Sequence, residues 1–138
     1  MPSIFSKIIA GQIPCYKIAE NEHCLAFLDI NPLKEGHTLV VPKKEVDDLF
    51  DLDNETYAHL LAFSKKIAKS IKASIACKRI SVVVLGFEVP HAHIHLIPIN
   101  SEGEINFKNA KLKFIKEEFE QTQRKISQSF ETLFKGSD

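Results

Sequence analysis

Three histidines in residues 90–98 are the side chains whose type and spacing most favour chemistry. His91, His93 and His95 occupy alternate positions, and small or aliphatic residues stand between them. Successive side chains of a β-strand point to opposite faces, so a strand here places the three imidazoles on one face and the apolar residues on the other. An imidazole can act as a nucleophile, a base or a hydrogen-bond donor near neutral pH. The pattern therefore predicts a reactive strand face above an apolar core.

Two other interpretations of the same histidines stay open. A purely structural role is disfavoured, because burying imidazoles without partners costs about a few kcal/mol for each ring. A metal site is the stronger alternative, since two histidines at positions i and i+2 of a strand can share one zinc ion. A metal-dependent hydrolase therefore remains an alternative to direct nucleophilic catalysis.

Apolar periodicity indicates which elements position these residues. Helical spacing of apolar residues predicts a long helix over residues 53–76, with Asp53 as its N-cap, and Ser3 is suited to cap a short helix over residues 3–10. Alternating or continuously apolar runs predict strands, and turn residues separate them. The predicted strands lie at residues 16–20, 24–29, 36–42 and 80–85, and a last amphipathic helix is predicted at residues 114–134.

The composition limits the class of protein. The chain has 138 residues, of which 44% are hydrophobic and 26% are charged, as is typical of one globular domain. Its 18 basic residues equal its 18 acidic residues, so no global positive field favours nucleic acid as a partner. We recognise no signal peptide and no apolar run of about 18 residues, and therefore expect no membrane span. Cys15, Cys24 and Cys77 imply no disulfide framework, and reduced thiols favour the cytoplasm.

The segment from His91 to Ile97 resembles the motif that defines the histidine triad (HIT) superfamily, which reads His-φ-His-φ-His-φ-φ with φ apolar. Three upstream stretches, at residues 4–9, 25–32 and 36–43, are similar in order and approximate spacing to the Hint-like branch of this superfamily. The resemblance covers about residues 3–99 and implies a nucleotide hydrolase or transferase.

The resemblance also implies a fold. We expect an α+β protein with a HIT-like fold, in which an antiparallel sheet of about five strands is flanked by helices and an extra amphipathic helix follows at the C-terminus. The HIT domain is expected at residues 1–110, and residues 111–138 form a helical extension that packs on the same domain or on its dimer partner. A homodimer that joins two sheets is expected by analogy with the family.

The resemblance assigns a role to each histidine. His93 would attack the α-phosphorus of a nucleoside 5′-phosphoryl compound, His91 would orient His93, and His95 and His37 would hold phosphate oxygens, with no metal or other cofactor. Cleavage of a phosphoramidate, ester or anhydride bond would pass through a nucleotidyl-histidine intermediate and release a nucleoside monophosphate. A purine nucleoside phosphoramidase is the expected activity, and a nucleotide-binding module with little turnover is a further alternative.

The resemblance implies nucleotide-binding residues as well. The Asp29 carboxylate would accept hydrogen bonds from the ribose 2′- and 3′-hydroxyls, although an Asp at a bend is also a common turn cap. Apolar residues of the first helix and of the second predicted strand would hold the base. The remaining expected contacts are Phe27, Leu28, Ile30, Ile4, Phe5, Ile8, Gly86, Glu88 and Val89.

Two departures from the family pattern concern metal binding and the leaving group. Ser3, Ser6 and Glu45 stand where some bacterial members have the Cys, Cys and His ligands of a structural zinc, so we expect no zinc here. The link before the triad, residues 86–90, is short and has Glu88 in place of the usual Ser or Thr. An ionised Glu88 only accepts hydrogen bonds and repels phosphate, whereas a protonated one is able to act as a general acid.

Overall fold

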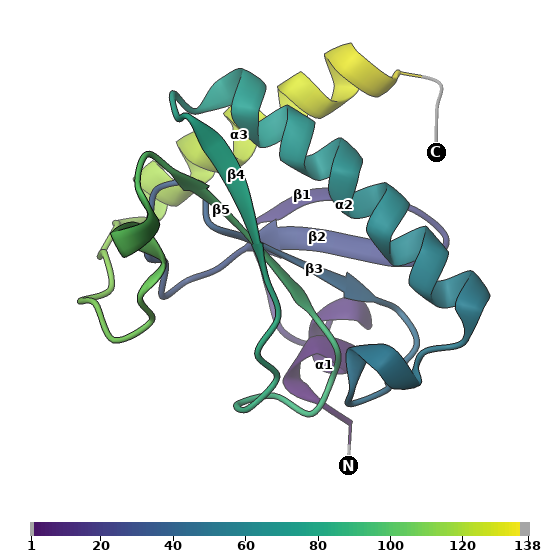
Figure 1. Cartoon of the computed structure of the whole chain (residues 1–138). Coiled ribbons are helices and arrows are strands. Elements are labelled where there is room, and N and C mark those ends of the chain that lie inside the picture. Colours follow the sequence, from purple (N-terminus) through teal and green to yellow (C-terminus); the bar gives the residue numbers. More distant parts are fainter. Residues whose placement is uncertain (1, 136–138) are drawn as a thin grey trace.

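Five strands form one antiparallel sheet in a computed structural model of the chain, which describes residues 2–135 (Figure 1). The strands are β1 (Lys17–Glu20), β2 (Cys24–Leu28), β3 (Thr38–Pro42), β4 (Arg79–Val83) and β5 (Ile94–Ile99), in the spatial order β1-β2-β3-β5-β4. The helices are α1 (Ile4–Ile9), α2 (Asn54–Ser74) and α3 (Lys116–Phe134), with two short 3-10 helices, η1 (Leu49–Asp51) and η2 (Glu102–Ile105). This architecture confirms the predicted α+β fold with flanking helices and a C-terminal helix.

Side-chain caps explain where the first two α-helices begin. Ser3 caps α1 by accepting the Ser6 N–H at 2.9 Å. Asp53 caps α2 by accepting the Thr56 N–H at 3.2 Å. Both contacts satisfy backbone donors that the first turn of a helix leaves without partners. The two caps predicted from the sequence are thus confirmed.

The sheet has α2 and α3 on one face and α1 on the other (Figure 1). Alternate residues of β2 show this division. Cys24, Ala26 and Leu28 belong to the main core under α2 and α3, whereas Leu25 and Phe27 lie in a second apolar cluster with α1. Because β2 is buried on both faces, its sequence is continuously apolar rather than alternating.

The predicted strand over residues 90–98 is shorter in the structure. β5 begins at Ile94, so the first two histidines of the triad precede it. The ladder with β3 stops there because Pro42 has no N–H to donate. The Pro42 carbonyl instead accepts a hydrogen bond from the His91 Nε2–H at 2.8 Å. A strand through all three histidines was therefore a wrong prediction. The alternation is nevertheless confirmed, since the apolar residues between the histidines lie in the main core: Ala92, Ile94 and Leu96.

The two edges of the sheet differ in how they are covered. At the β1 edge, Gln123 of α3 donates to the Lys17 carbonyl at 2.8 Å, and Ser127 donates to the Ile18 carbonyl at 2.8 Å. Covering edge carbonyls in this way hinders the pairing of a further strand. At the β4 edge, Val82 is 62% exposed. The C-terminal helix therefore closes one edge of the sheet, while the other edge presents apolar side chains.

The C-terminal helix packs on the same chain. Its buried residues Phe119 and Ile126 join the main core, and α3 contacts both α2 and β1. The boundary between a domain at 1–110 and an extension at 111–138 stays a prediction, and residues 1 and 136–138 of these segments lie outside the described part. None of the helices within residues 2–135 has both the length and the apolar character needed to cross a bilayer.

Candidate active site

His93 has one ring nitrogen fixed and one without a partner. Its Nδ1 lies 2.8 Å from the His91 carbonyl oxygen, and because a carbonyl only accepts, the neutral ring carries its proton on Nδ1. Within residues 2–135, no hydrogen bond is made to its Nε2. The residue is only 7% exposed. An oriented lone pair of this kind, accessible on a mostly buried ring, is suited to nucleophilic attack.

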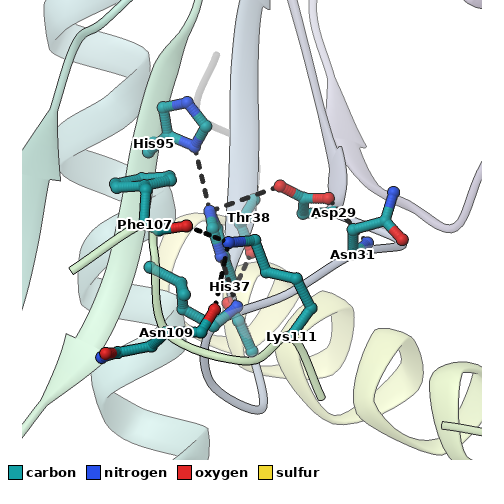
Figure 2. A network of polar contacts seen from close by, with 10 residues as sticks. Asp29, Asn31, His37, Thr38, His95, Phe107, Asn109 and Lys111 are labelled. Atoms are coloured by element: carbon teal, nitrogen blue, oxygen red, sulfur yellow. Dashed lines mark hydrogen bonds and ion pairs between the residues drawn. The ribbon is translucent and has the colours of Figure 1, made fainter. Parts of the chain in front are cut away.

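His37 and His95 form a hydrogen-bonded imidazole pair (Figure 2). The Leu33 backbone N–H donates to His37 Nδ1 at 3.0 Å, so the proton of neutral His37 is on Nε2. That Nε2–H donates to His95 Nδ1 at 3.0 Å, which places the His95 proton on Nε2. His95 Nε2 has no partner in the described part of the chain, and the His95 ring centroid is 5.1 Å from that of His93. A lone pair and an N–H donor thus lie on neighbouring rings.

His91 is fully buried and has both ring nitrogens occupied. Its Nε2 donates to the Pro42 carbonyl at 2.8 Å, and its Nδ1 accepts the Ser3 hydroxyl at 2.7 Å. Because Ser3 also caps α1, this contact ties the triad to the helix that covers this face of the sheet. His91 therefore offers its carbonyl oxygen, rather than its imidazole, to His93.

Ser3→Ala is expected to lower the free energy of unfolding by about 1–2 kcal/mol, because it removes the α1 cap and a hydrogen bond to buried His91. Urea denaturation of variant and wild type measures the difference. Ser101→Ala is the matched control, since Ser101 stands at the N-cap of η2 but makes no side-chain capping bond. If both variants unfold like the wild type, the Ser3 hydroxyl does not hold α1 on the triad.

Ser3, Ser6, Glu45 and His91 converge, as the family pattern implies, but this group does not fit a zinc ion. One Glu45 carboxylate oxygen accepts the Ser3 N–H at 2.7 Å and the Ser6 hydroxyl at 2.6 Å. The His91 Nδ1 lone pair, which a metal would need, accepts the Ser3 hydroxyl. Serine hydroxyls are also poor ligands for zinc compared with thiolates. The four side chains satisfy one another through hydrogen bonds instead.

An apolar cluster, which we call the α1-face cluster, lies beside His93. The ring of Phe5 meets that of His93 edge-on, with centroids 5.0 Å apart, and Phe27 packs behind Phe5 at 5.7 Å. Such packing gives one side of the reactive imidazole an apolar, aromatic wall. The cluster comprises Phe5, Leu25, Phe27, Leu39 and Val41, with Ile8, Ile9, Cys15 and Val89 packed against it.

Sequence reasoning identified part of the α1-face cluster and missed the rest. Phe5, Ile8, Phe27 and Val89 were expected there, and the structure places them together. Leu39 was not expected, although it lies directly opposite Phe27 in the β2–β3 ladder. The strand register carries the signal that could have found it, because residues paired across a ladder share a face.

Five other residues expected to bind a nucleotide are not part of the α1-face cluster. Leu28 is in the main core, on the opposite face of the sheet from the α1-face cluster. Ile30 and Ile4 are 64% and 49% exposed. Gly86 and Glu88 are exposed, and within residues 2–135 no hydrogen bond or ring contact joins either of them to an imidazole. Leu28 therefore faces away from the α1-face cluster, and nucleotide contact by the other four residues stays a prediction.

Asp29 directly follows β2 and faces the imidazole pair (Figure 2). Its Oδ1 accepts the Asn31 N–H at 2.8 Å, which is the turn-capping contact, and its Oδ2 lies 3.5 Å from His37 Nε2. The side chain is 18% exposed. A carboxylate accepts about four hydrogen bonds, so this one retains capacity for a ligand hydroxyl.

Burial keeps the imidazole pair uncharged. Removal from water lowers the pKa of both His37 and His95 to about 4. For His37, the charge of Lys111 is a second and smaller cause of the lowered pKa. For His95, the charges of His37 and His93 lower the pKa, whereas that of Asp29 raises it. Both imidazoles are thus neutral at pH 7, as their hydrogen-bonded tautomers require.

We expect the free energy of unfolding to fall by about 2–4 kcal/mol between pH 7 and pH 5. In the folded protein the pKa of each imidazole in the pair is about 4, which is below the ordinary value for histidine. At a pH between these two pKa values, the unfolded chain therefore binds more protons than the folded chain. The contribution of the two neutral imidazoles to the free energy of unfolding is complete above the ordinary pKa of histidine, and it is lost as the pH falls toward 4. Urea denaturation at several pH values measures the slope.

Two double variants test the source of this slope. Replacing His37 and His95 by Gln should flatten the pH dependence. Replacing Gln121 and Gln128, two exposed residues of α3 that carry no titratable group, by Ala should leave it unchanged. An unchanged slope in the first double variant would show that the imidazole pair is not its origin.

Comparison with known proteins agrees with this geometry. The model of the HIT domain family matches residues 10–102. An uncharacterized HIT-like protein of Borreliella burgdorferi is 37% identical over 132 residues, which cover 90% of this chain and 95% of that protein. The adenosine 5′-monophosphoramidase of Schizosaccharomyces pombe is 39% identical over 103 residues, which cover 74% of this chain and 77% of that protein.

A solved structure is similar over nearly the whole chain. A hypothetical histidine triad nucleotide-binding protein of Sulfolobus tokodaii superposes with a TM-score of 0.79 and 31% identity, covering 94% of this chain and 92% of that one. The resemblance first noted in the triad segment thus extends to the full sheet and its helices. With its triad, its fold and a family match over most of its length, the chain belongs to the HIT domain family.

Proposed function

We propose that the chain is a metal-independent nucleotidyl hydrolase, with a purine nucleoside 5′-phosphoramidate as its expected substrate. The observation that carries this proposal is the His93 Nε2 lone pair beside the His95 Nε2–H donor. A nucleophile next to a preorganised hydrogen-bond donor suits attack on a phosphoryl group, because negative charge on the phosphoryl oxygens must be stabilised as the new bond forms.

In the first step, His93 Nε2 forms a bond to the α-phosphorus, and the bond from phosphorus to the leaving nitrogen breaks. The leaving nitrogen takes a proton from solvent and departs as an amine. The His93 ring becomes a cation, which its Nδ1–H contact to the His91 carbonyl stabilises. His95 donates its Nε2–H to a non-bridging phosphate oxygen, and His37 fixes the tautomer of His95.

In the second step, water attacks the phosphorus and the bond to His93 breaks. The water loses a proton to solvent, the imidazole returns to its neutral form, and a nucleoside 5′-monophosphate leaves. Water thus supplies the oxygen of the product phosphate. The two steps together hydrolyse one phosphorus–nitrogen bond, and the same route serves an ester or anhydride leaving group.

The surroundings of His93 support a nucleoside as the group that is transferred. Ile8 and Val89, the partly buried residues at the rim of the α1-face cluster, offer apolar contacts to a purine, and Asp29 retains oxygen lone pairs for ribose hydroxyls. The relative from Schizosaccharomyces pombe is named as an adenosine 5′-monophosphoramidase, and the similar structure from Sulfolobus tokodaii as a nucleotide-binding protein. These names favour an adenine nucleotide as the first compound to test.

The tautomers of the imidazole pair support catalysis without a metal. Ligand atoms of Asp29, His37 and His95 lie within 4.8 Å of one another, so their spacing alone would allow an ion. A metal would need the His37 Nε2 lone pair, but the Leu33 N–H on Nδ1 places the ring proton on Nε2. Activity is therefore expected to survive EDTA.

The open β4 edge supports a homodimer that joins two sheets. α3 covers the carbonyls of β1, whereas Val82, Val84 and Leu85 are 62%, 40% and 47% exposed at or just after β4. An exposed apolar edge strand is suited to pairing with another copy. Val82→Lys should shift the protein toward the monomer in light scattering, and an unchanged mass would point to another interface.

Thiol chemistry supports a cytoplasmic setting. Cys15, Cys24 and Cys77 are free thiols, and burial raises the pKa of Cys24 to about 11. A raised pKa disfavours the reactive thiolate. Three unpaired thiols are the usual condition of proteins in a reducing compartment.

The proposed function is tested by incubating the protein with adenosine 5′-phosphoramidate and measuring AMP by chromatography. We expect multiple turnovers, with equal rates with and without EDTA. A loss of activity in EDTA that zinc restores would favour the metal-dependent alternative. AMP binding without turnover of any nucleotidyl compound would favour a nucleotide-binding module. Glu88, which is exposed and stands at the usual Ser or Thr position, is the reason to test this alternative.

A further inference from the structure

The segment between β5 and α3 reaches back to the imidazole pair (Figure 2). The ring of Phe107 meets that of His95 edge-on, with centroids 5.0 Å apart at an angle of 73°. It also approaches His37, with centroids 6.2 Å apart. Phe107 is half-buried, although its neighbours in residues 106–111 are exposed. Phe107 is therefore the residue of this loop whose side chain packs against the imidazole pair.

Several contacts fasten the loop in this place. Glu104 forms an ion pair with Lys34 at 3.5 Å, and the Leu112 N–H donates to the Pro32 carbonyl at 2.8 Å. These contacts attach both sides of the loop to the turn between β2 and β3, which also carries His37. The position of Phe107 is thus set by the same turn that positions the imidazole pair.

His95 needs more than its hydrogen bond to point in one direction. The contact from His37 to His95 Nδ1 fixes one atom of the ring but leaves the ring able to tilt about it. The His93 ring lies near one part of His95 at 63°, and the Phe107 ring lies near it at 73°. Packing against both rings limits the tilt, and so determines where the Nε2–H points.

We propose that Phe107 is a positioning residue, which holds the His95 imidazole so that its Nε2–H meets the phosphate. This inference rests on the proposed nucleotidyl transfer to His93. It assigns a function to the loop between β5 and α3. This loop belongs to the same chain as the imidazoles, so no partner subunit is needed for the contact. Phe107 itself takes no part in bond making, because it acts through His95.

The charged groups around the pair agree with this role. Asp29, next to β2, and His93, just before β5, face the pair from the sheet. Lys111 faces it from the loop, and its amine donates to the Phe107 carbonyl and, at 3.4 Å, to the Asn109 carbonyl. The Lys111 charge lowers the pKa of His37, so the loop both packs on the pair and helps to keep it neutral.

Phe107→Ala is expected to lower kcat for adenosine 5′-phosphoramidate about tenfold, with KM changed less than about twofold. The α1-face cluster and Asp29 stay in place, so nucleotide binding is retained while the donor is misdirected. Phe107→Leu restores apolar bulk and should recover most of the loss. Phe50→Ala is the matched control, since Phe50 is 78% exposed and contacts Tyr57 rather than an imidazole.

A second measurement separates this inference from the proposed function. NMR of protein labelled with ¹⁵N-histidine reports the His95 ring directly, whether or not the protein turns over a substrate. Both Phe107 variants lose the ring current of the phenyl group on His95, so positioning is read from the difference between them. We expect the His95 signals of Phe107→Ala to differ from those of Phe107→Leu, and the His91 signals to agree between the two. Identical His95 signals in the two variants, or an unchanged kcat in both Phe107 variants of an active enzyme, would overturn the positioning role. Absence of turnover in the wild type, with His95 shifts as expected, would overturn only the proposed function.

Discussion

His93→Ala is expected to lower kcat for adenosine 5′-phosphoramidate by about 10⁴-fold or more, the loss typical of removing a covalent nucleophile. The Nδ1 contact to the His91 carbonyl leaves Nε2 as the lone pair available for attack. None of the neighbouring rings is able to replace it, because His95 carries its proton on Nε2 and His91 has both nitrogens occupied. Steady-state kinetics with chromatographic detection of AMP measures the loss.

The variant should still fold and bind AMP, because the His93 ring makes one hydrogen bond and the proposed ribose contact, Asp29, is held by Asn31 rather than by His93. Binding of AMP by calorimetry therefore serves as the internal control. His23→Ala is the matched substitution, since His23 is a half-buried histidine that stacks on His59. A His93 variant that retains more than about one hundredth of the wild-type kcat would contradict nucleophilic attack by this ring.

His95→Ala is expected to lower kcat by about 10²–10³-fold with little change in KM. The loss corresponds to one preorganised donor aimed at the charge that develops on the phosphoryl oxygens. The donor is preorganised because the relay from the Leu33 N–H through His37 fixes the proton of His95 on Nε2. The same kinetic assay, run over a range of substrate concentrations, separates kcat from KM.

Two further variants sharpen this prediction. His95→Gln keeps an N–H donor on a flexible side chain and should fall between alanine and wild type. His37→Ala removes the contact that fixes the tautomer but leaves the His95 ring, so its loss in kcat should be smaller than that of His95→Ala. If His95→Ala raised KM and left kcat unchanged, His95 would contribute to ground-state binding only.

Most elements of the fold could be predicted from the sequence because their signals are local. The apolar stripe and the Asp53 cap located α2, and the continuously apolar runs located β2 and β3. The ends of strands were less predictable, because they depend on pairing partners. β4 ends at Val83, opposite His95, although its apolar sequence continues to Leu85.

The histidines of the site were recognisable from their spacing, but their chemical roles depend on contacts that the sequence does not show. In the relay from Leu33 through His37 to His95, the last contact joins residues 58 positions apart, and the relay determines which nitrogen of His95 carries the proton. The contact between Ser3 and His91 spans 88 positions. Tautomers could therefore be assigned only after the fold was known.

Phe107 shows most clearly what the sequence could not predict. It lies in a polar loop, and neither periodicity nor motif distinguishes it from other phenylalanines of the chain. Its contact with His95 depends on the fastening of the loop to Lys34 and Pro32, which are far away in sequence. Glu88 is the opposite case, since its place before the triad suggested a role, but the structure leaves it exposed.

The central claim is that His93 carries the nucleotidyl group between the two chemical steps. The most direct test is the intact mass of the protein, quenched early after mixing with adenosine 5′-phosphoramidate, for wild type and His93→Ala in parallel. We predict an added mass of one adenylyl group on the wild type and none on the variant, with AMP released as the adduct decays. An adduct that also forms on the variant, or AMP release with no adduct on the wild type under a denaturing quench at alkaline pH, where a phosphorus–nitrogen bond to imidazole survives, would contradict the claim.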